Sequence, residues 1–214
     1  MTIKILNLYA GIGGNRKLWT GDIEVTAIEL NPEIAKIYQD FFPNDKIIVT
    51  DAHQYLLDHY KEFDFIWSSP PCPSHSRIRQ FSAVARGQNK PIFPNMQLYQ
   101  EIIFLMYNFE GKWVVENVIS YYEPLIKPQE LASHYFWSNF NLGNKKIETR
   151  GHNATMDIRQ EIKGFDLSKY EGIDKQKILR NCVEPKTGLH IFNMAFKTKQ
   201  QILITGMSSE ELKE

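Results

Sequence analysis

The chain has 214 residues, of which 43% are hydrophobic, so it can form one domain with a buried core. Its 25 basic and 25 acidic residues give a formal net charge of zero, which excludes attraction of nucleic acid by bulk positive charge. Two cysteines cannot make a disulfide framework or a metal cluster, and no run approaches the roughly 20 apolar residues of a membrane span. No signal-peptide pattern opens the chain, so we expect a cytoplasmic protein of a bacterial or phage-infected cell, without a membrane partner.

Strand-like and helix-like segments alternate through the first 120 residues. The predicted strands are 3–10, 24–30, 46–50, 63–69 and 112–118, and the predicted helices are 15–21, 31–42, 51–60 and 96–109. Such alternation predicts an α/β fold with a doubly wound, mostly parallel sheet and helices on both faces. Nearly continuous apolar strands fit a sheet that is buried on both sides.

The pattern is weaker after residue 120. Segments 134–142 and 145–151 could be strands, and 197–205 could form a last strand before an acidic tail. Residues 153–180 are polar and only weakly periodic. The sequence contains no internal repeat.

The first three predicted strands end in residues that suit a nucleoside. The first ends in the glycine-rich loop YAGIGG (9–14), the second in Glu29 and the third in Asp51. Ligands bind beyond the carboxyl ends of strands in open α/β sheets, where an acid after a glycine loop can accept hydrogen bonds from ribose. The loop is one residue short of the dinucleotide pattern, and no basic residue follows it directly. The pattern favours a nucleoside without phosphate, such as S-adenosylmethionine.

The next two strand ends carry candidate chemistry. The fourth strand runs into Ser69-Pro70-Pro71-Cys72, where two prolines make a stiff turn. The fifth ends in Glu116-Asn117, which an adjacent parallel strand would bring beside Cys72. A thiolate and a carboxylic acid together suggest covalent attack on an electron-poor ring that the acid protonates.

A basic segment follows Cys72. Residues 73–100 contain no Asp or Glu, but they contain Arg77, Arg79, Arg86 and Lys90. A local basic segment of this kind can contact phosphates although the whole chain is neutral.

Taken in order, LYAGIGG, AIEL, TDAH, SSPPCP and VVENV resemble the DNA cytosine-5 methyltransferase family, in the form of a small, phage-like member. The resemblance covers roughly residues 3–120. It implies a Rossmann-like class I fold that depends on S-adenosylmethionine, with S-adenosylhomocysteine as product and no metal. It also implies double-stranded DNA as partner, and we expect a monomer.

Roles follow residue by residue from the resemblance. Cys72 would attack C6 of a flipped-out cytosine, Glu116 would protonate N3, and Asn117 would hold the Cys72 loop. Arg150 is the candidate for contacting the cytosine O2, ahead of Arg159. The implied cofactor-binding residues are Tyr9, Ala10, Gly11, Ile12, Gly13, Gly14, Glu29, Leu30, Asp51, Ala52, Pro71, Leu98, Asn181 and Val183. The implied nucleic-acid contacts are Ser76, Arg77, Arg79, Arg86 and Lys90.

The same resemblance divides the chain into three parts. Residues 1–120 would form the cofactor-binding and catalytic core, and 121–196 a reduced target-recognition region with the return of the chain to the core. Residues 197–214 would form the final strand and tail.

The sequence departs from the family at Pro73, where glutamine is usual. Three alternatives stay open: an RNA cytosine-5 methyltransferase, a DNA amino-methyltransferase that uses a Ser-Pro-Pro turn, and an inactive cofactor-binding or DNA-binding remnant. Cysteine cannot stack on a base as the aromatic residue of amino-methyltransferases does, and nitrogen methylation does not require Glu116-Asn117.

Overall fold

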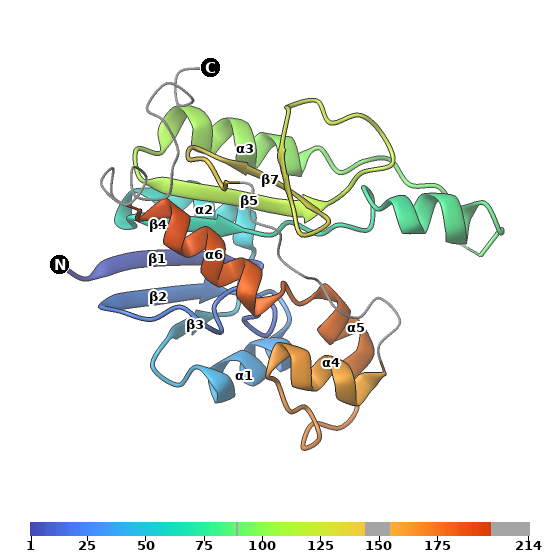
Figure 1. Ribbon diagram of the computed structural model, residues 1–214, viewed down its shortest axis with the longest axis horizontal. Coiled ribbons are helices and arrows are strands. Elements are labelled where there is room, and N and C mark those ends of the chain that lie inside the picture. The colour runs from blue at the N-terminus through green and yellow to red at the C-terminus, as the bar shows by residue number, and fades with distance from the viewer. Residues whose placement is uncertain (89, 144–154, 198–214) are drawn as a thin grey trace.

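A computed structural model describes residues 1–88, 90–143 and 155–197, and these residues form one seven-stranded sheet (Figure 1). The strand order is β3-β2-β1-β4-β5-β7-β6. The strands are β1 (Ile3–Leu8), β2 (Ile23–Ile28), β3 (Lys46–Ile48), β4 (Phe65–Ser68), β5 (Lys112–Val118), β6 (Gln129–Leu131) and β7 (His134–Ser138). Strands β1 to β5 pair in parallel, and β7 runs antiparallel to both β5 and β6. The predicted mostly parallel sheet is confirmed.

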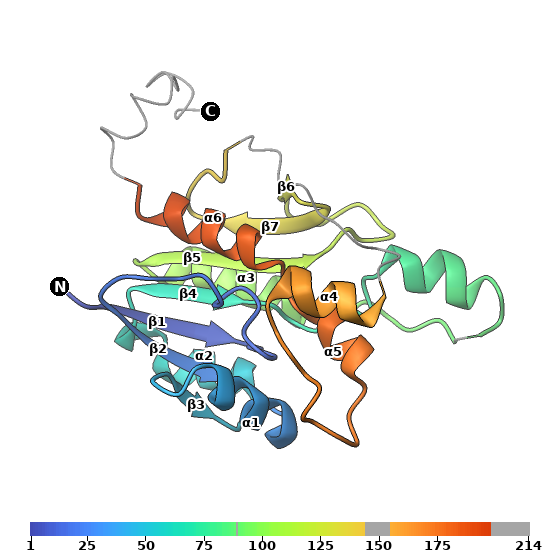
Figure 2. The same cartoon turned by 60° about the horizontal axis from the view of Figure 1, so that its bottom comes forward.

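Helices cover both faces of this sheet (Figures 1 and 2). The helices are α1 (Pro32–Phe41), α2 (Ala52–His59), α3 (Gln97–Asn108), α4 (Met156–Lys163), α5 (Lys175–Asn181) and α6 (Pro185–Ala195), with short turns η1 (Tyr60–Glu62) and η2 (Arg79–Val84, a π-helix). One core cluster joins α2 and α3 to one face of the sheet, and a second joins α6 to the other. Central strands are therefore buried on both sides, as their apolar sequences predict.

Local sequence explains where the first two helices begin. The Asn31 side chain accepts hydrogen bonds from the amides of Glu33 and Ile34, and Pro32 occupies the first turn of α1. The Asp51 side chain accepts from the amide of Gln54 and caps α2. Both caps satisfy donors that a helix start leaves without partners. Each helix therefore begins directly beyond a strand end that carries a candidate site residue.

Two predicted elements differ in the structure. Residues 15–21 form turns rather than a helix, and the strand expected at 134–142 ends at Ser138. The expected strand at 145–151 and nearly all of that at 197–205 lie outside the described residues. Strand β6 and helices α4, α5 and α6 were not predicted.

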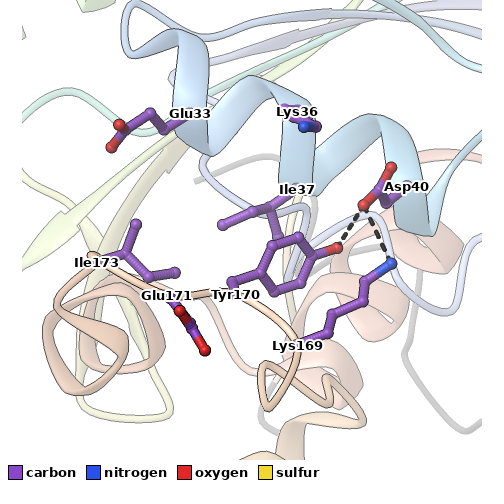
Figure 3. A pocket seen from close by; sticks show the side chains of 8 residues that line it. All are labelled: Glu33, Lys36, Ile37, Asp40, Lys169, Tyr170, Glu171 and Ile173. Carbon is purple, nitrogen blue, oxygen red and sulfur yellow. Dashed lines mark hydrogen bonds and ion pairs between the residues drawn. The ribbon is translucent and has the colours of Figure 1, made fainter.

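A third core cluster attaches the segment after α4 to α1, with Phe165 and Leu167 fully buried. Beside it lies an open hollow of about 400 Å³ between α1 and the α4–α5 loop (Figure 3). There Asp40 accepts hydrogen bonds from the Tyr170 hydroxyl at 2.7 Å and from the Lys169 ammonium at 3.1 Å. None of the predicted site residues lines this hollow, and its contacts fasten the α4–α5 segment to the core.

A search of the described residues finds no helix with the length and apolar character needed to cross a membrane.

Candidate functional site

The predicted site residues meet at one edge of the sheet because five parallel strands end there. Strands β1, β2 and β4 end before Tyr9, Glu29 and Ser69, while β5 contains Glu116 and Asn117 near its end. Carboxyl ends of parallel strands share an edge, so residues that are distant in sequence lie close together.

The glycine loop and Glu29 form one unit. The Gly11 amide donates to one carboxylate oxygen of Glu29 at 3.0 Å, and the Asn31 amide donates to the other at 2.9 Å. Gly11 has a φ of +55°, and a Cβ added there would meet no atom within 4 Å. A carboxylate oxygen can accept more than one hydrogen bond, so Glu29 retains capacity for hydroxyl donors. The loop therefore leaves open space beside the Glu29 carboxylate, whose position is fixed by two backbone hydrogen bonds.

The chain returns to this loop after α5. A Cβ on Gly14 would lie 2.3 Å from both the Cys182 sulfur and the Val183 carbonyl oxygen, so only glycine allows this close approach. Lys163 donates to the Cys182 carbonyl and fixes the same turn. The chain thus returns to the glycine loop at Cys182 and Val183, as predicted. Val183 is half-buried, and the preceding Asn181 is exposed.

A buried carboxylate connects two strand ends and the first turn of α2. Glu101 of α3 has no exposed surface and accepts from the Tyr9 hydroxyl at 2.5 Å and from the Ser68 hydroxyl at 2.6 Å. The His53 Nδ1 lies 3.1 Å from the same group. Burial and Glu101 raise the pKa of Tyr9 far above its ordinary value, so its hydroxyl stays protonated and donates. The network fixes Tyr9, which has a φ of +55°, before the glycine loop.

Sequence reasoning missed Glu101 as part of this site. Its position in the sequence indicates a buried carboxylate, because Glu101 shares the apolar stripe of α3 with Leu98, Ile102 and Leu105. A carboxylate on a stripe that packs into the core is buried only when polar partners meet it.

The turn that carries Cys72 is held from β5. The Asn117 side chain donates to the Pro70 carbonyl at 3.0 Å and accepts from the Val118 amide at 3.0 Å. The Cys72 carbonyl accepts from the amides of His75 and Ser76 at 3.0 and 3.1 Å. These bonds close a compact turn, and they leave the Cys72 side chain half-buried at the strand end.

Cys72 and Glu116 interact electrostatically. Burial, and then the negative charge of Glu116, raise the pKa of Cys72 to about 11. Glu116 itself is 8% exposed. The thiol is therefore protonated at neutral pH, and the Glu116 carboxyl group is close enough to affect it electrostatically.

This raised pKa predicts slow alkylation of Cys72 by iodoacetamide. A higher pKa leaves less thiolate at a given pH, so we expect the rate at pH 8 to be roughly ten- to a hundredfold below that of a free cysteine. The rate should rise about tenfold per pH unit up to about pH 11. Peptide mass spectrometry checks this and separates Cys72 from Cys182. A rate that levels off near pH 8 would contradict it.

The basic segment projects from the sheet as an arm between β4 and α3 (Figures 1 and 2). Arg77, Arg86 and Lys90 are exposed on it, whereas Arg79 is half-buried and donates to the Lys90 carbonyl at 3.1 Å. Ser76 pairs with Ser120 through an isolated β-bridge at the base of the arm. Exposed cations on the arm are available to a polyanion.

The other predicted residues lie in the core, on the surface, or outside the described residues. Leu98 is 2% exposed and belongs to the core of α3, whereas Leu30 is 67% exposed beyond β2. Asp51 is exposed, and one of its oxygens accepts from the Gln54 amide. Arg150 lies outside the described residues, and Arg159 lies in α4. Of the remaining predicted cofactor-binding residues, Ala10, Ile12, Gly13 and Ala52 are buried, and Pro71 is exposed.

Two histidines near Glu116 and Cys72 were not predicted as site residues. His75 is 1% exposed, and its Nδ1 lies 2.6 Å from the Tyr122 hydroxyl, while its Nε2 has no partner among the described residues. His134 Nε2 lies 3.7 Å from the Glu116 carboxylate. No sequence spacing predicts that contact, because it depends on the register of β5 with β7. Within the described ranges, no group of three or more His, Cys, Asp or Glu could hold a metal ion.

Comparison with known proteins gives local but consistent matches. The sequence profile of the family described as C-5 cytosine-specific DNA methylase matches residues 3–124. A tRNA (cytosine(38)-C(5))-methyltransferase from Spodoptera frugiperda is 33% identical over 84 residues, which cover 36% of this chain and 25% of that protein.

Similar solved structures include a triple mutant of DNMT2 from Spodoptera frugiperda, with 25% identity, a TM-score of 0.40, and coverage of 54% of this chain and 35% of that one. Another is a putative DNA modification methyltransferase encoded in an E. coli prophage, with 16% identity, a TM-score of 0.37, and coverage of 56% and 33%. The matched part of this chain thus spans about a quarter to a third of the length of these relatives.

The sheet order, with β7 reversed between β5 and β6, is the Rossmann-like arrangement of class I S-adenosylmethionine-dependent methyltransferases. The profile match spans the glycine loop, Glu29, the Cys72 turn and Glu116-Asn117. This chain belongs to the C-5 cytosine-specific DNA methylase family.

Proposed function

We propose that the protein transfers a methyl group from S-adenosylmethionine to C5 of cytosine in DNA, with Cys72 as nucleophile and Glu116 as the acid at N3. The observation that carries the proposal is the meeting of Cys72 and Glu116, whose charge helps raise the pKa of the thiol to about 11. A nucleophile and an acid in one site suit a pyrimidine ring, because C6 can take the nucleophile while N3 takes a proton.

The residues of the glycine loop fit a nucleoside methyl donor. Open space beside Gly11 would admit the ligand, and Glu29 would accept hydrogen bonds from ribose hydroxyls. The proposed donor supplies an electrophilic methyl group. Tyr9, held by Glu101, and the Cys182–Val183 turn would flank the same loop.

In the proposed reaction, the Cys72 thiol loses its proton to solvent and the sulfur adds to C6, while Glu116 gives a proton to N3. Electron density then collects at C5, which takes the methyl group. Loss of the C5 proton to solvent and return of the N3 proton to Glu116 allow the C6–sulfur bond to break, and Cys72 leaves as the thiolate. Asn117 keeps the Cys72 turn in place throughout by holding the Pro70 carbonyl. C6 is inaccessible inside a stacked duplex, so the cytosine must leave the stack.

A second candidate substrate is tRNA, which the match to a tRNA methyltransferase favours. The addition chemistry at C6 and C5 is the same for both polymers. The exposed cations of the arm, Arg77, Arg86 and Lys90, would meet phosphates of either one.

The proposal is tested with a labelled methyl donor, duplex DNA of mixed sequence and unmodified tRNA. We expect label in DNA, and bisulfite sequencing should map it to cytosine C5. Label only in tRNA would replace DNA by RNA as substrate. Label in neither polymer, with methyl donor bound, would favour an inactive remnant.

Glu29→Gln tests the nucleoside site. The amide cannot accept at both positions, so it would lose the Gly11 or the Asn31 contact together with a ribose contact. We expect the Kd for the methyl donor to rise about 10- to 100-fold, because a charge-assisted hydrogen bond contributes about 1.5–3 kcal/mol. Isothermal titration calorimetry measures the change. Glu24→Gln, an exposed acid on the same strand, is the control and should leave the Kd unchanged. Equal affinities for Glu29→Gln and the parent would place the donor elsewhere.

A further inference from the structure

His134 faces Glu116 from the neighbouring strand. Its Nε2 lies 3.7 Å from Glu116 Oε1, and its side chain is 41% exposed while that of Glu116 is 10% exposed. The histidine therefore lies on the more open side of the carboxylate, where it can reach both Glu116 and solvent.

The sheet fixes this placement. His134 pairs with Val118, and Phe136 pairs with Glu116, in the antiparallel ladder of β5 and β7. Directly paired and diagonal residues share one face of a sheet, so His134 and Glu116 are diagonal neighbours. The turn before β7 has two residues with positive φ, Ala132 at +50° and Ser133 at +63°. Residues other than glycine rarely adopt that conformation, and strained backbone of this kind concentrates at functional sites.

One ring nitrogen has a fixed role. His134 Nδ1 lies 3.1 Å from the Ala132 carbonyl oxygen, which can only accept, so Nδ1 carries a proton. Loss or gain of the second proton then occurs at Nε2, the nitrogen that faces Glu116.

The proposed reaction needs a proton that a carboxyl group alone supplies poorly. Carboxylic acids are ionised in water at neutral pH, yet N3 must be protonated as sulfur adds to C6. Histidine is the side chain whose charge changes closest to neutral pH. A histidine that faces the Glu116 carboxylate can therefore supply it with a proton.

We propose that His134 is a positioning residue that shares one proton with Glu116, an inference that rests on the proposed function. In the loaded pair, the imidazolium Nε2–H faces the Glu116 carboxylate. The Nε2 proton passes to Glu116, which gives it to N3, so that His134 becomes neutral and Glu116 is again a carboxylate. Breaking of the C6–sulfur bond returns the proton by the same route, so one proton leaves and re-enters the pair in each cycle.

The groups around the imidazole are those expected for such a pair. Glu116 faces it from β5, and Cys72 lies beyond Glu116 on the β4 turn. The residue paired with it on β6 is Leu131, which carries no charge.

The test follows exchange of the cytosine C5 hydrogen with solvent in the absence of methyl donor. This exchange needs addition of Cys72, protonation of N3, and gain and loss of a solvent proton at C5, but no methyl donor. It is measured at pH 7, below saturating nucleic acid, as release of tritium from C5.

His134→Gln removes the titrating group. Its exchange rate at pH 7 should fall about 10- to 100-fold. His134→Arg keeps a positive charge but has no proton to share, so it should not restore the parent rate. His59→Gln is the matched control, because His59 forms a 2.7 Å pair with Glu62 on the exposed end of α2. Melting temperatures verify folding of each variant.

Two outcomes would overturn the inference alone: a His134→Gln exchange rate at pH 7 equal to that of the parent, or full rescue by His134→Arg. A parent that neither exchanges C5 hydrogen nor transfers methyl groups would overturn the proposed function as well.

Discussion

Replacement of Cys72 by alanine is expected to abolish methyl transfer, with a loss of at least about 10⁴-fold. The reason is that the one other cysteine of the sequence, Cys182, is buried and packs against Gly14, so it cannot supply a second thiol. Removal of a covalent nucleophile leaves only binding and electrostatic effects, which recover a small part of the acceleration. Transfer of labelled methyl groups to DNA and to tRNA measures the loss.

Stability and donor binding serve as controls for Cys72→Ala. The side chain is half-buried at the end of a turn that backbone and Asn117 hydrogen bonds hold, so its truncation should leave the fold intact. Cys72→Ser preserves the shape with a much weaker nucleophile and should lose activity to a similar degree. Parental activity in Cys72→Ala would exclude covalent addition and favour transfer to an exocyclic nitrogen, which analysis for N4-methylcytosine would detect.

Glu116→Gln should change two measurements in opposite directions. Methyl transfer should fall about 10²- to 10⁴-fold, because the amide cannot protonate N3. Alkylation of Cys72 should become faster, since loss of the negative charge lowers the pKa of the thiol and increases the thiolate at a given pH. Both rates are measured at pH 8 on the same preparations.

Glu130→Gln is the matched control for Glu116→Gln. It makes the same chemical change at an exposed position of β6 in the same sheet, and neither rate should alter. Slower methyl transfer by Glu116→Gln without faster alkylation would contradict the electrostatic contact with Cys72. Faster alkylation without loss of transfer would remove Glu116 from the reaction.

The parallel half of the fold could be predicted from sequence because its information is local. Each strand from β1 to β5 is a short apolar run, and each ends at a turn residue or a helix cap such as Asn31 or Asp51. The proposed catalytic pair, Cys72 and Glu116, followed from the same reasoning, since adjacent parallel strands bring their ends to one edge of the sheet.

The rest depends on contacts between distant segments. Helix α6 contains Gly188, which lowers helix propensity, but a Cβ there would lie 2.3 Å from the Asn15 carbonyl oxygen. This contact packs α6 against the start of residues 15–21, which form turns rather than the predicted helix. Sequence periodicity contains neither constraint.

His134 was missed for a related reason. Its approach to Glu116 requires the antiparallel register of β5 with β7, two strands that are not joined by a tight turn. The two-residue turn at Ala132 and Ser133 joins β6 to β7. That turn lacks the asparagine and glycine that usually mark such hairpins in sequence.

Covalent trapping tests directly whether Cys72 attacks C6 of cytosine. Fluorine at C5 blocks loss of the C5 proton, so the reaction stops with the base still attached to sulfur. Random-sequence duplex DNA and a tRNA transcript, both containing 5-fluorocytosine, are incubated with the protein and methyl donor, and the product is digested for mass spectrometry. We expect a denaturation-resistant complex in which the methylated base is attached to Cys72, and no complex with Cys72→Ala. Methyl transfer to cytosine without any complex, or attachment at another residue, would contradict it.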